Sequence, residues 1–453
     1  MKIVIIGAGL GGLATALSLG RAGFEDVTVI ERASELRPLG VGINLLPHAV
    51  RELTELGLAE QVAAIAAAPG RLAYFNRHGQ PVWSEPRGLD AGYQWPQLSV
   101  HRGEFQLLLV EAVRERFGAD AIGLGWRATG VEHGVEVSDA TRASGGIRRQ
   151  ERVRFADAAG DELVLDADVV VAADGIHSAI RAQANPGEGA PPWNRLLLWR
   201  GTAVVPTYLD GRTMIMAGDA EQKFVAYPLA AGATGEAAPE GFTRVNFIAE
   251  RRAPEGVDET ADWNHAVDPA PIVELFADWR FDWLDVPGVI AAADEILEYP
   301  MVDRDPLERW IFGRTTLLGD AAHALYPNGS NGASQAILDA RTLAFHLAGA
   351  AAAGGAGDDT DDADDGSAID AALAAYEADR RPATTKLSGM TRQLGPERVM
   401  QLAYERAPQG FADVHDVIPE AELQQIADSY KVAAGFHPDR LNERSSLTRA
   451  VRA

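Results

Sequence analysis

The most constraining feature of the chain is a glycine pattern that directly follows a short apolar segment. Residues 3–6 read Ile-Val-Ile-Ile, which is typical of a buried parallel strand. Gly7, Gly9 and Gly12 then fit the spacing G-x-G-x-x-G. The first glycine permits a tight turn, the second admits a pyrophosphate close to the backbone, and the third lets helix and strand pack closely. The chain is therefore predicted to begin with a β-α-β unit that binds a dinucleotide.

A carboxylate at the end of the next predicted strand supports this interpretation. Residues 26–31 read Asp-Val-Thr-Val-Ile-Glu, and Glu31 lies 19 positions after Gly12, where such an acid accepts hydrogen bonds from a ribose diol. The N-terminus of the intervening helix would face the phosphates. Strand, glycines, helix, strand and acid in this order predict binding of an ADP moiety; a glycine-rich turn without a ligand is the weaker alternative. The apolar stripe of that helix is Leu10, Leu13, Ala14 and Leu17.

Composition excludes several classes of function. The net charge of −24 argues against a nucleic-acid partner, because phosphates require basic patches. The absence of cysteine excludes disulfides, thiolate metal sites and a cysteine nucleophile, and we expect no metal site. The chain opens directly into a strand and contains no apolar run of about 20 residues, so we expect neither a signal peptide nor a membrane span. A cytoplasmic protein with two or three lobes is predicted.

Two further segments repeat the pattern of a strand followed by a polar turn. The strand 169–173 ends in Asp174-Gly175 and leads into a predicted helix with Ser178 and Arg181. The strand-like stretch after residue 315 ends in Gly319-Asp320, and a loop containing Pro327 precedes a helix. Each aspartate alone would be read as an ordinary turn residue. Together with the matching glycines, they favour a shared ligand site.

The middle of the chain has a different character. Strand-like stretches at 196–205, 213–217, 224–227 and 243–249 are separated by turns without a clear helix, which predicts an antiparallel sheet. An amphipathic helix is expected around 271–283, carrying Phe276, Trp279 and Trp283.

The first lobe is therefore predicted to be interrupted by a second one. We expect a first lobe of 1–78, 100–190 and 300–350, a second lobe of 79–99 and 191–299, an acidic disordered loop at 351–367, and a helical segment from 368 to 453.

Three motifs in this order resemble those of the single-component FAD-dependent aromatic hydroxylases, the salicylate and p-hydroxybenzoate hydroxylase group. They are GAGLGG with Glu31, DGIHSAIR at 174–181 and GDAAHALYP at 319–327. Segments such as RPLGVGIN at 37–44 and GASQAILD at 332–339 look most like the phenazine-biosynthesis flavin hydroxylases. The resemblance implies an α/β fold, with a Rossmann-like FAD-binding domain in the first lobe, an antiparallel-sheet substrate domain in the second, and a helical C-terminal segment.

The resemblance also implies residue roles. Glu31 would bind the adenosine ribose, Asp320 a ribityl hydroxyl, and Arg102 the ribityl or phosphate region, while Asp174 would lie near the pyrophosphate. Backbone amides at Gly332 and Ala333 would stabilise negative charge on the flavin. Ser178 and Arg181 would also serve NADPH binding. The full expected cofactor set is Gly7, Gly9, Leu10, Gly12, Glu31, Arg32, Gly42, Arg102, Asp174, Gly175, Ser178, Arg181, Gly319, Asp320, Pro327, Gly332 and Ala333.

One departure and several other side chains bear on the same site. Many family members read Gly-Gln-Gly where this chain has Ser330-Asn331-Gly332. His323 follows the GD motif, but a histidine beside such a turn is more often a structural hydrogen-bonding group than a catalytic one. Trp199 and Tyr227, on predicted sheet strands, are candidates for the substrate pocket.

The implied activity is a monooxygenase reaction. NADPH or NADH reduces FAD, dioxygen gives a flavin hydroperoxide, and its distal oxygen is transferred to an aromatic or fused heteroaromatic ring, with oxidative decarboxylation as a variant. No protein side chain is assigned a catalytic role. Arg200 and Lys223 are candidate partners of a substrate carboxylate, although solvated charges are the more usual role. The alternatives are an FAD-dependent reductase of the related group and a non-catalytic flavin-binding protein. A monomer or homodimer is expected.

Overall fold

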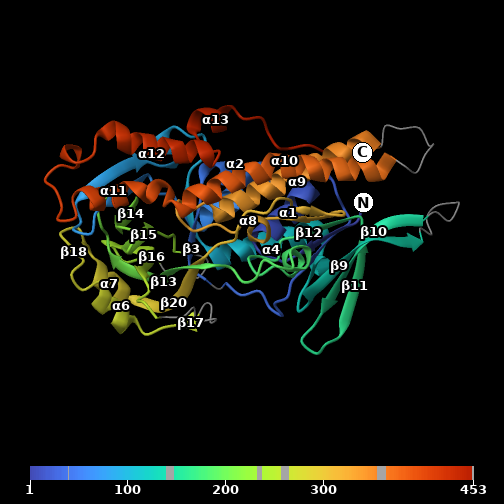
Figure 1. Cartoon of the computed structure of the whole chain (residues 1–453), viewed down its shortest axis with the longest axis horizontal. Helices are drawn as coiled ribbons and strands as arrows, with labels where there is room; N and C mark the ends of the chain where they lie inside the picture. The colour runs from blue at the N-terminus through green and yellow to red at the C-terminus, as the bar shows by residue number, and fades with distance from the viewer. Residues whose placement is uncertain (39, 139–146, 232–236, 257–264, 355–363, 451–453) are drawn as a thin grey trace.

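The computed structural model describes residues 1–38, 40–138, 147–231, 237–256, 265–354 and 364–450. Two sheets form the centres of two lobes that lie side by side, and long helices from the C-terminal third run along one side of both (Figure 1). The predicted acidic loop at 351–367 falls partly outside the described residues. Both of its ends are helical in the structure: helix α9 extends to Gly354, and helix α10 begins at Asp364.

The first lobe is built on a six-stranded sheet in the order β21-β22-β12-β1-β2-β8. Strand β1 (Ile3–Ile6) lies at its centre, pairs in parallel with β2 (Val27–Ile30) and β12 (Val169–Ala172), and is fully buried. Burial on both faces explains the unbroken apolar runs in these strands. Helices α1 (Leu10–Ala22) and α9 (Gly332–Gly354) pack against each other over this sheet. The remaining strands are β8 (Ile122–Gly123), β21 (Ile311–Phe312) and β22 (Thr315–Leu317).

The second lobe is an eight-stranded sheet in the order β17-β20-β13-β16-β15-β14-β5-β6. The predicted antiparallel stretches are confirmed as β13 (Trp193–Pro206), β14 (Thr213–Gly218), β15 (Gln222–Pro228) and β16 (Phe242–Arg252). The other strands are β5 (Arg71–Phe75), β6 (Pro81–Pro86), β17 (His265–Ala266) and β20 (Ala293–Val302).

Two boundaries differ from the prediction. Strand β5, which we assigned to the first lobe, pairs in parallel with β14, so the second lobe takes up the chain from residue 71 instead of 79. The predicted helix over 271–283 is also shorter: α6 (Pro269–Leu275) ends before the aromatic residues. Phe281 and its neighbours instead form the two-residue strands β18 (Arg280–Phe281) and β19 (Leu284–Asp285), because their alternating apolar residues pack against α7 (Val286–Ala291) and the sheet.

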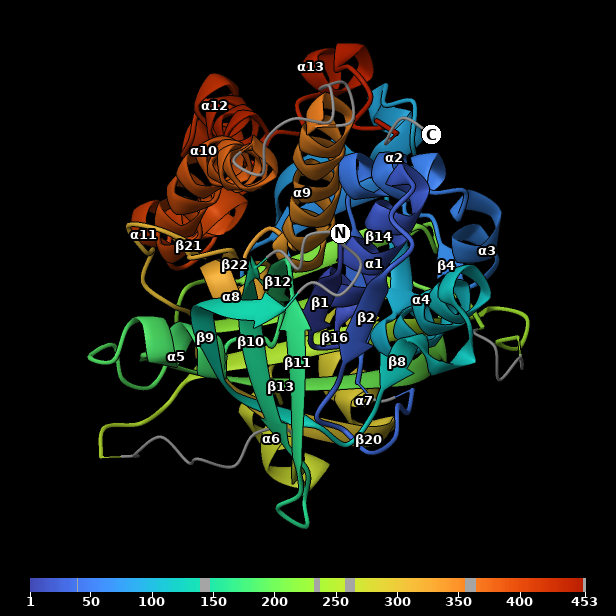
Figure 2. The same cartoon turned by 90° about the vertical axis from the view of Figure 1, so that its right-hand side faces the viewer.

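A smaller sheet of β9 (Arg127–Ser138), β10 (Ile147–Ala156) and β11 (Glu162–Ala167) lies against the six-stranded sheet, in front of it in Figure 2. The other elements of the first half connect these sheets. They are β3 (Gly42–Leu45), α2 (Pro47–Glu55), α3 (Ala59–Ala64), β4 (Ala66–Ala67), β7 (Leu98–His101), α4 (Arg102–Phe117) and α5 (Ala179–Ala184).

The C-terminal segment is helical, as predicted, and bridges the two lobes. Helix α10 (Asp364–Arg392) packs on α9 of the first lobe, whereas α11 (Arg398–Arg406) contacts strands β5, β6 and β14 of the second. The 3-10 helix η3 (Gly395–Glu397) joins them, and α12 (Glu420–Ala433) and α13 (Pro438–Glu443) follow. Among the described residues, every helix is too short or too polar to traverse a lipid bilayer.

Candidate functional site

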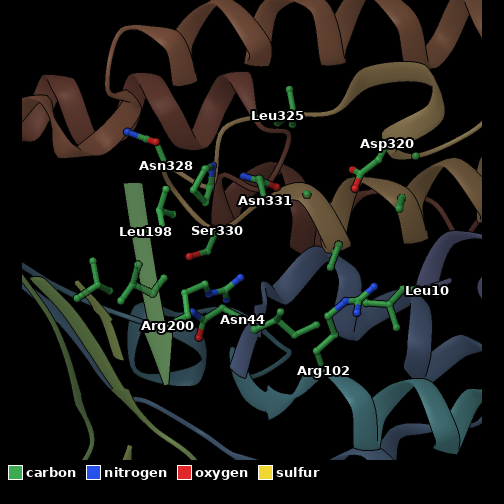
Figure 3. Close-up of a pocket in the computed structure, with 18 of the residues that line it drawn as sticks. Leu10, Asn44, Arg102, Leu198, Arg200, Asp320, Leu325, Asn328, Ser330 and Asn331 are labelled. Atoms are coloured by element: carbon green, nitrogen blue, oxygen red, sulfur yellow. The ribbon is translucent and has the colours of Figure 1, made fainter. Parts of the chain in front are cut away.

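A cavity of about 380 Å³ lies between the two lobes, where the polar turns of the first lobe face one side of the eight-stranded sheet. Figure 3 shows Leu10, Arg102 and Asp320 at one end of it and Leu198 and Arg200 on the sheet at the other. The cavity is lined by both candidate carboxylate partners, Arg200 and Lys223, and by ten of the residues predicted for the cofactor or the substrate pocket: Gly9, Leu10, Arg102, Gly175, Tyr227, Gly319, Asp320, Pro327, Gly332 and Ala333.

The three glycines of the first turn have three different steric environments. A Cβ atom at Gly12 would lie 1.9 Å from the carbonyl oxygen of Gly7, and one at Gly7, where φ is +103°, would lie 2.4 Å from the oxygen of Ala173. A Cβ at Gly9 would meet no atom within 4 Å, although Gly9 lines the cavity. Gly7 and Gly12 are therefore required by the fold, whereas Gly9 leaves open space at the N-terminus of α1, as a pyrophosphate requires.

Glu31, at the end of β2, lies next to this turn and outside the cavity itself. Its Oε2 accepts the backbone N–H of Ala8 at 2.8 Å, and its Oε1 accepts that of Ala33 at 2.8 Å. Each oxygen keeps a further lone pair for a ribose hydroxyl. Arg32, which follows it, is exposed.

Arg102 is the first residue of α4, and its guanidinium lies beside Leu10 at the same end of the cavity (Figure 3). It is exposed and lines the end of the cavity next to the glycine turn, so it can reach an anionic group held at the N-terminus of α1.

The GD turn is held by buried groups that the motif alone did not indicate. Asp320 begins the short helix α8 (Asp320–His323), is exposed and faces the cavity (Figure 3). Behind it, Asp339 is fully buried, accepts the Gly319 N–H at 3.1 Å and bonds His323 Nε2 at 2.5 Å and Arg380 Nε at 2.7 Å. His323 and Arg380 hold the pKa of Asp339 at about 2, although burial alone would raise it. His323 thus forms a hydrogen bond behind the GD turn, which agrees with the structural role that its position favours.

The DG motif lies on the other side of the glycine turn. Burial raises the pKa of Asp174, whose Oδ2 accepts the Ala179 N–H at 2.9 Å and whose Oδ1 is buried without a partner among the described residues. Ser178 caps α5 by accepting the N–H of Arg181.

Arg181 does not reach the cavity. It is 1% exposed and donates to Glu188 and to the carbonyl groups of Asp305, Ala321 and Ala322. Its guanidinium thus fixes the turn that carries Asp320, and its donors are used within the protein.

The loop 327–333 contains the departure from the Gly-Gln-Gly pattern. Ser330 has φ +55°, a left-handed conformation that costs a residue with a Cβ about 1 kcal/mol and that glycine adopts freely. Its side chain lines the cavity. Gly332 begins α9 and Ala333 follows, so their N–H groups belong to the first turn, which has no acceptors within the helix, and both residues line the cavity. These amides can stabilise negative charge on a bound ring system.

The sheet contributes the opposite wall. The carbonyl of Gly42 accepts the Tyr227 hydroxyl at 2.6 Å and Arg200 Nη2 at 2.9 Å, which joins β3 of the first lobe to the sheet. Arg200 Nε is buried without a partner among the described residues. Trp199, predicted as a pocket residue, lies on the other face of the sheet, where its Nε1 donates to Glu298. That prediction was wrong because successive side chains of a strand alternate between faces.

Sequence reasoning missed an ionic cluster at the far end of the cavity. Lys223, Glu250 and Glu397 are 5%, 3% and 4% exposed, and all three line the cavity. Lys223 is paired with both glutamates, so it is neither a solvated surface charge nor a free cation for a substrate carboxylate. Glu397 comes from the C-terminal segment, and no local pattern in the sequence connects it with residue 223.

This arrangement fits FAD. Open space at Gly9 meets the N-terminus of α1, carboxylates lie where ribose and ribityl hydroxyls would bind, and free amides of α9 face the same cavity. The residues that would hold the cofactor thus come from four separate stretches of the chain that only the fold brings together.

A family model described as "FAD binding domain" matches residues 1–231 and 292–390. The chain belongs to this FAD-binding family. Within it, the chain is similar to the "Phenazine 1,6-dicarboxylic acid hydroxylase PhzS" of Lysobacter antibioticus, with 42% identity over 95% of this chain and 96% of the relative. It is also similar to the 3-amino-4-hydroxybenzoate 2-monooxygenase of Streptomyces cremeus, with 31% identity over 76% of this chain and 77% of that protein.

The fold of this chain is similar to that of solved structures. HpxO of Klebsiella pneumoniae complexed with FAD and uric acid matches with a TM-score of 0.66 and 22% identity, covering 97% of this chain and 96% of that one. The family match and the two relatives make the protein an FAD-dependent monooxygenase of the aromatic hydroxylase type, with FAD as cofactor and NAD(P)H as co-substrate. The predicted family, cofactor, fold class and type of enzyme are confirmed.

Proposed function

We propose that the protein hydroxylates a carboxylated fused heteroaromatic ring, of the phenazine type, and that Arg200 binds the substrate's carboxylate. The 42% identity to a hydroxylase named for a phenazine dicarboxylate, over nearly the whole of both chains, supports the ring class. The assignment of Arg200 rests on the state of its guanidinium beside the cavity. Its Nε is buried without a partner among the described residues, and its Nη2 donates a hydrogen bond to the carbonyl of Gly42. A guanidinium anchored by one nitrogen presents its others in a fixed direction to a carboxylate.

The remaining groups divide into cofactor-holding and ring-holding sets. Bound FAD supplies the hydride-accepting and oxygen-activating chemistry. Glu31 accepts hydrogen bonds from the ribose hydroxyls, and Asp320 accepts one from a ribityl hydroxyl. Arg102 contacts the phosphate or ribityl region. The amides of Gly332 and Ala333 stabilise negative charge on the reduced ring. Arg181 acts through the turn that it holds, and no contact with the nicotinamide is assigned to it.

The sheet wall provides the dry surface that the reaction requires. Leu198, Met216, Val225 and Ile248 line the cavity next to Arg200 and exclude water from the ring. Water exclusion matters because oxygen transfer competes with loss of hydrogen peroxide. Attack at an unsubstituted carbon adds one oxygen atom. Attack at a carboxylated carbon gives the phenol, CO₂ and water from the aryl carboxylate, O₂, NAD(P)H and two protons.

The test is NAD(P)H oxidation in air by the FAD-loaded enzyme, with phenazine-1-carboxylate, phenazine-1,6-dicarboxylate, hydroxybenzoates and quinolones. We expect a phenazine carboxylate to stimulate oxidation and to yield a product labelled from ¹⁸O₂. Arg200→Met should raise the KM for that substrate at least tenfold at unchanged FAD content, whereas Arg212→Met, an exposed arginine of the same lobe, should not. If no phenazine stimulates oxidation, or if the product gains two hydrogens without oxygen, the proposal is wrong.

A further inference from the structure

The ionic cluster at the far end of the cavity contains one more carboxylate than it has cations. Lys223 Nζ on β15 lies 3.1 Å from Glu250 Oε2 on β16 and 2.5 Å from Glu397 Oε2 in η3. Each glutamate uses Oε2 for this pairing, and their Oε1 atoms form no hydrogen bond with any other described residue. The cluster therefore has a net charge of −1 when both glutamates are ionised.

Asn328 adds a further acceptor at the same place. Its Nδ2 donates to Glu397 Oε2 at 3.2 Å, and its Oδ1 is buried without a partner among the described residues. Asn328 is 4% exposed and lines the cavity. The amide orientation follows from the bond to Glu397, because only the nitrogen can donate. Apart from one N–H of Lys223 and one of Asn328, the groups left open by this cluster are carboxylate and carbonyl oxygens, which are hydrogen-bond acceptors.

A structural ion pair would not require this composition. Burying a charge is costly unless it is paired, and one glutamate would neutralise Lys223. Burial raises the pKa of Glu250, and the neighbouring Glu397 acts in the same direction, while Lys223 and Arg252 oppose them. The second carboxylate is therefore buried beside another negative charge at the wall of a ligand cavity. Ionisable groups in such unfavourable environments are concentrated at functional sites.

The register of the sheet relates this cluster to Arg200. Arg200 pairs with Ile248, and Lys223 pairs with Glu250 two residues further along β16, so the side chains of all four lie on one face. Diagonal neighbours such as Arg200 and Glu250 have Cβ atoms about 7–8 Å apart in an antiparallel sheet. One ring system can therefore reach both Arg200 and Glu250, with a donor-rich site at one end and an acceptor-rich site at the other.

We propose that Glu250, Glu397 and Asn328, held in place by Lys223, form an acceptor subsite that binds a hydroxyl or amino substituent of the ring substrate. The proposal rests on the proposed function and deepens it. It names the substituent at the end of the ring system opposite to the carboxylate that Arg200 binds. The substituent donates its hydrogen bond to Glu250 Oε1, and Lys223 keeps both carboxylates oriented. A second carboxylate at this end is disfavoured by repulsion, because the cluster already contains more carboxylates than cations.

Three ligands with one skeleton test the subsite: phenazine-1-carboxylate and its derivatives with a 6-hydroxyl or a 6-carboxylate. Their dissociation constants are measured with the oxidised, FAD-loaded enzyme from the perturbation of the flavin absorbance, so turnover is not needed. We expect the 6-hydroxy compound to bind at least tenfold more tightly than phenazine-1-carboxylate, and the dicarboxylate to bind more weakly than both.

Glu250→Gln removes one charge and keeps the shape of the side chain. We expect the tenfold preference for the 6-hydroxy compound to fall below threefold in this variant, while affinity for phenazine-1-carboxylate changes little. Glu298→Gln is the matched control, because Glu298 is a glutamate of the same sheet on the opposite face, bonded to Trp199. Glu397→Gln gives an independent second variant if Glu250→Gln does not fold.

The outcomes separate this proposal from the proposed function. If phenazine-1-carboxylate binds but the 6-hydroxyl adds nothing, or if Glu250→Gln and Glu397→Gln retain the full preference, the subsite proposal fails alone. Tighter binding of the dicarboxylate than of the 6-hydroxy compound would also overturn it, because the cluster would then act as an anion site around Lys223. If no phenazine perturbs the flavin spectrum or stimulates NAD(P)H oxidation, the proposed function fails and the subsite proposal fails with it.

Discussion

The glycine turn allows a prediction that separates folding from cofactor binding. A Cβ at Gly12 would lie 1.9 Å from Gly7 O and 3.3 Å from Ile5 Cγ2, whereas ordinary contacts begin near 3.4 Å. Gly12→Ala therefore forces the turn away from α1 by more than about 1 Å, and overpacking of this size against backbone costs about 3 kcal/mol. For a chain of 453 residues, with an unfolding entropy of about 2.1 cal/mol/K per residue, that corresponds to a fall in the thermal midpoint of about 3 °C.

Gly9→Ala is the matched control with the opposite signature. Its φ of −72° suits any residue, and a Cβ there would meet no protein atom within 4 Å. The added methyl group instead occupies the space left for the pyrophosphate. We expect stability without FAD to change by less than about 1 kcal/mol, while the Kd for FAD rises at least tenfold.

The assay is thermal unfolding at a series of FAD concentrations, since the increase in stability with ligand reports affinity and the extrapolation to zero FAD reports the fold itself. Gly12→Ala should lower the extrapolated midpoint, and Gly9→Ala should flatten the dependence on FAD. An unchanged midpoint for Gly12→Ala, or a Gly9→Ala variant that is destabilised yet binds FAD normally, would refute the steric reasoning.

Three further predictions concern two other residues of the site and one buried histidine outside it. Asp320→Ala should weaken FAD binding at least tenfold by titration, with Asp320→Asn keeping part of the affinity. Ser330→Gly should raise stability by about 0.5–1 kcal/mol in thermal unfolding by relieving a positive φ, while Ser330→Ala should not. Burial, with Arg444 and Arg380, lowers the pKa of His48 to about 3. The unfolded histidine takes up its proton near pH 6.5, so stability falls as pH drops below that value. His48→Phe should therefore remove about 3 kcal/mol of the acid-dependent loss between pH 7 and pH 4 in denaturant unfolding.

The parts of the site that the sequence predicted are those encoded by contiguous residues. The strand 3–6, the glycines and Glu31 form one local unit whose geometry follows from steric requirements at single positions. The strands of the second lobe were likewise predicted from alternation and turn residues. The resemblance in three motifs then identified the family and the FAD cofactor.

Other assignments failed or were missed because they depend on packing between distant segments. The face of β13 was misjudged at Trp199, because a strand's two faces are distinguished only by what covers each. Strand β5 joined the second lobe by pairing with β14, about 140 residues away in sequence. Arg181 was expected at the nicotinamide and instead donates to the carbonyls of the GD turn.

The sequence by itself determined the dinucleotide-binding turn and the strands of the second lobe, because local sterics and residue alternation are sufficient for these. The flavin chemistry followed from the resemblance of three motifs to a known family. Tertiary structure alone decided which polar groups meet in the substrate end of the cavity. Lys223, Glu250 and Glu397 come together only when the sheet register and the C-terminal helices are set. The cost of burying their charges depends on that environment, so it cannot be read from the residues that carry them.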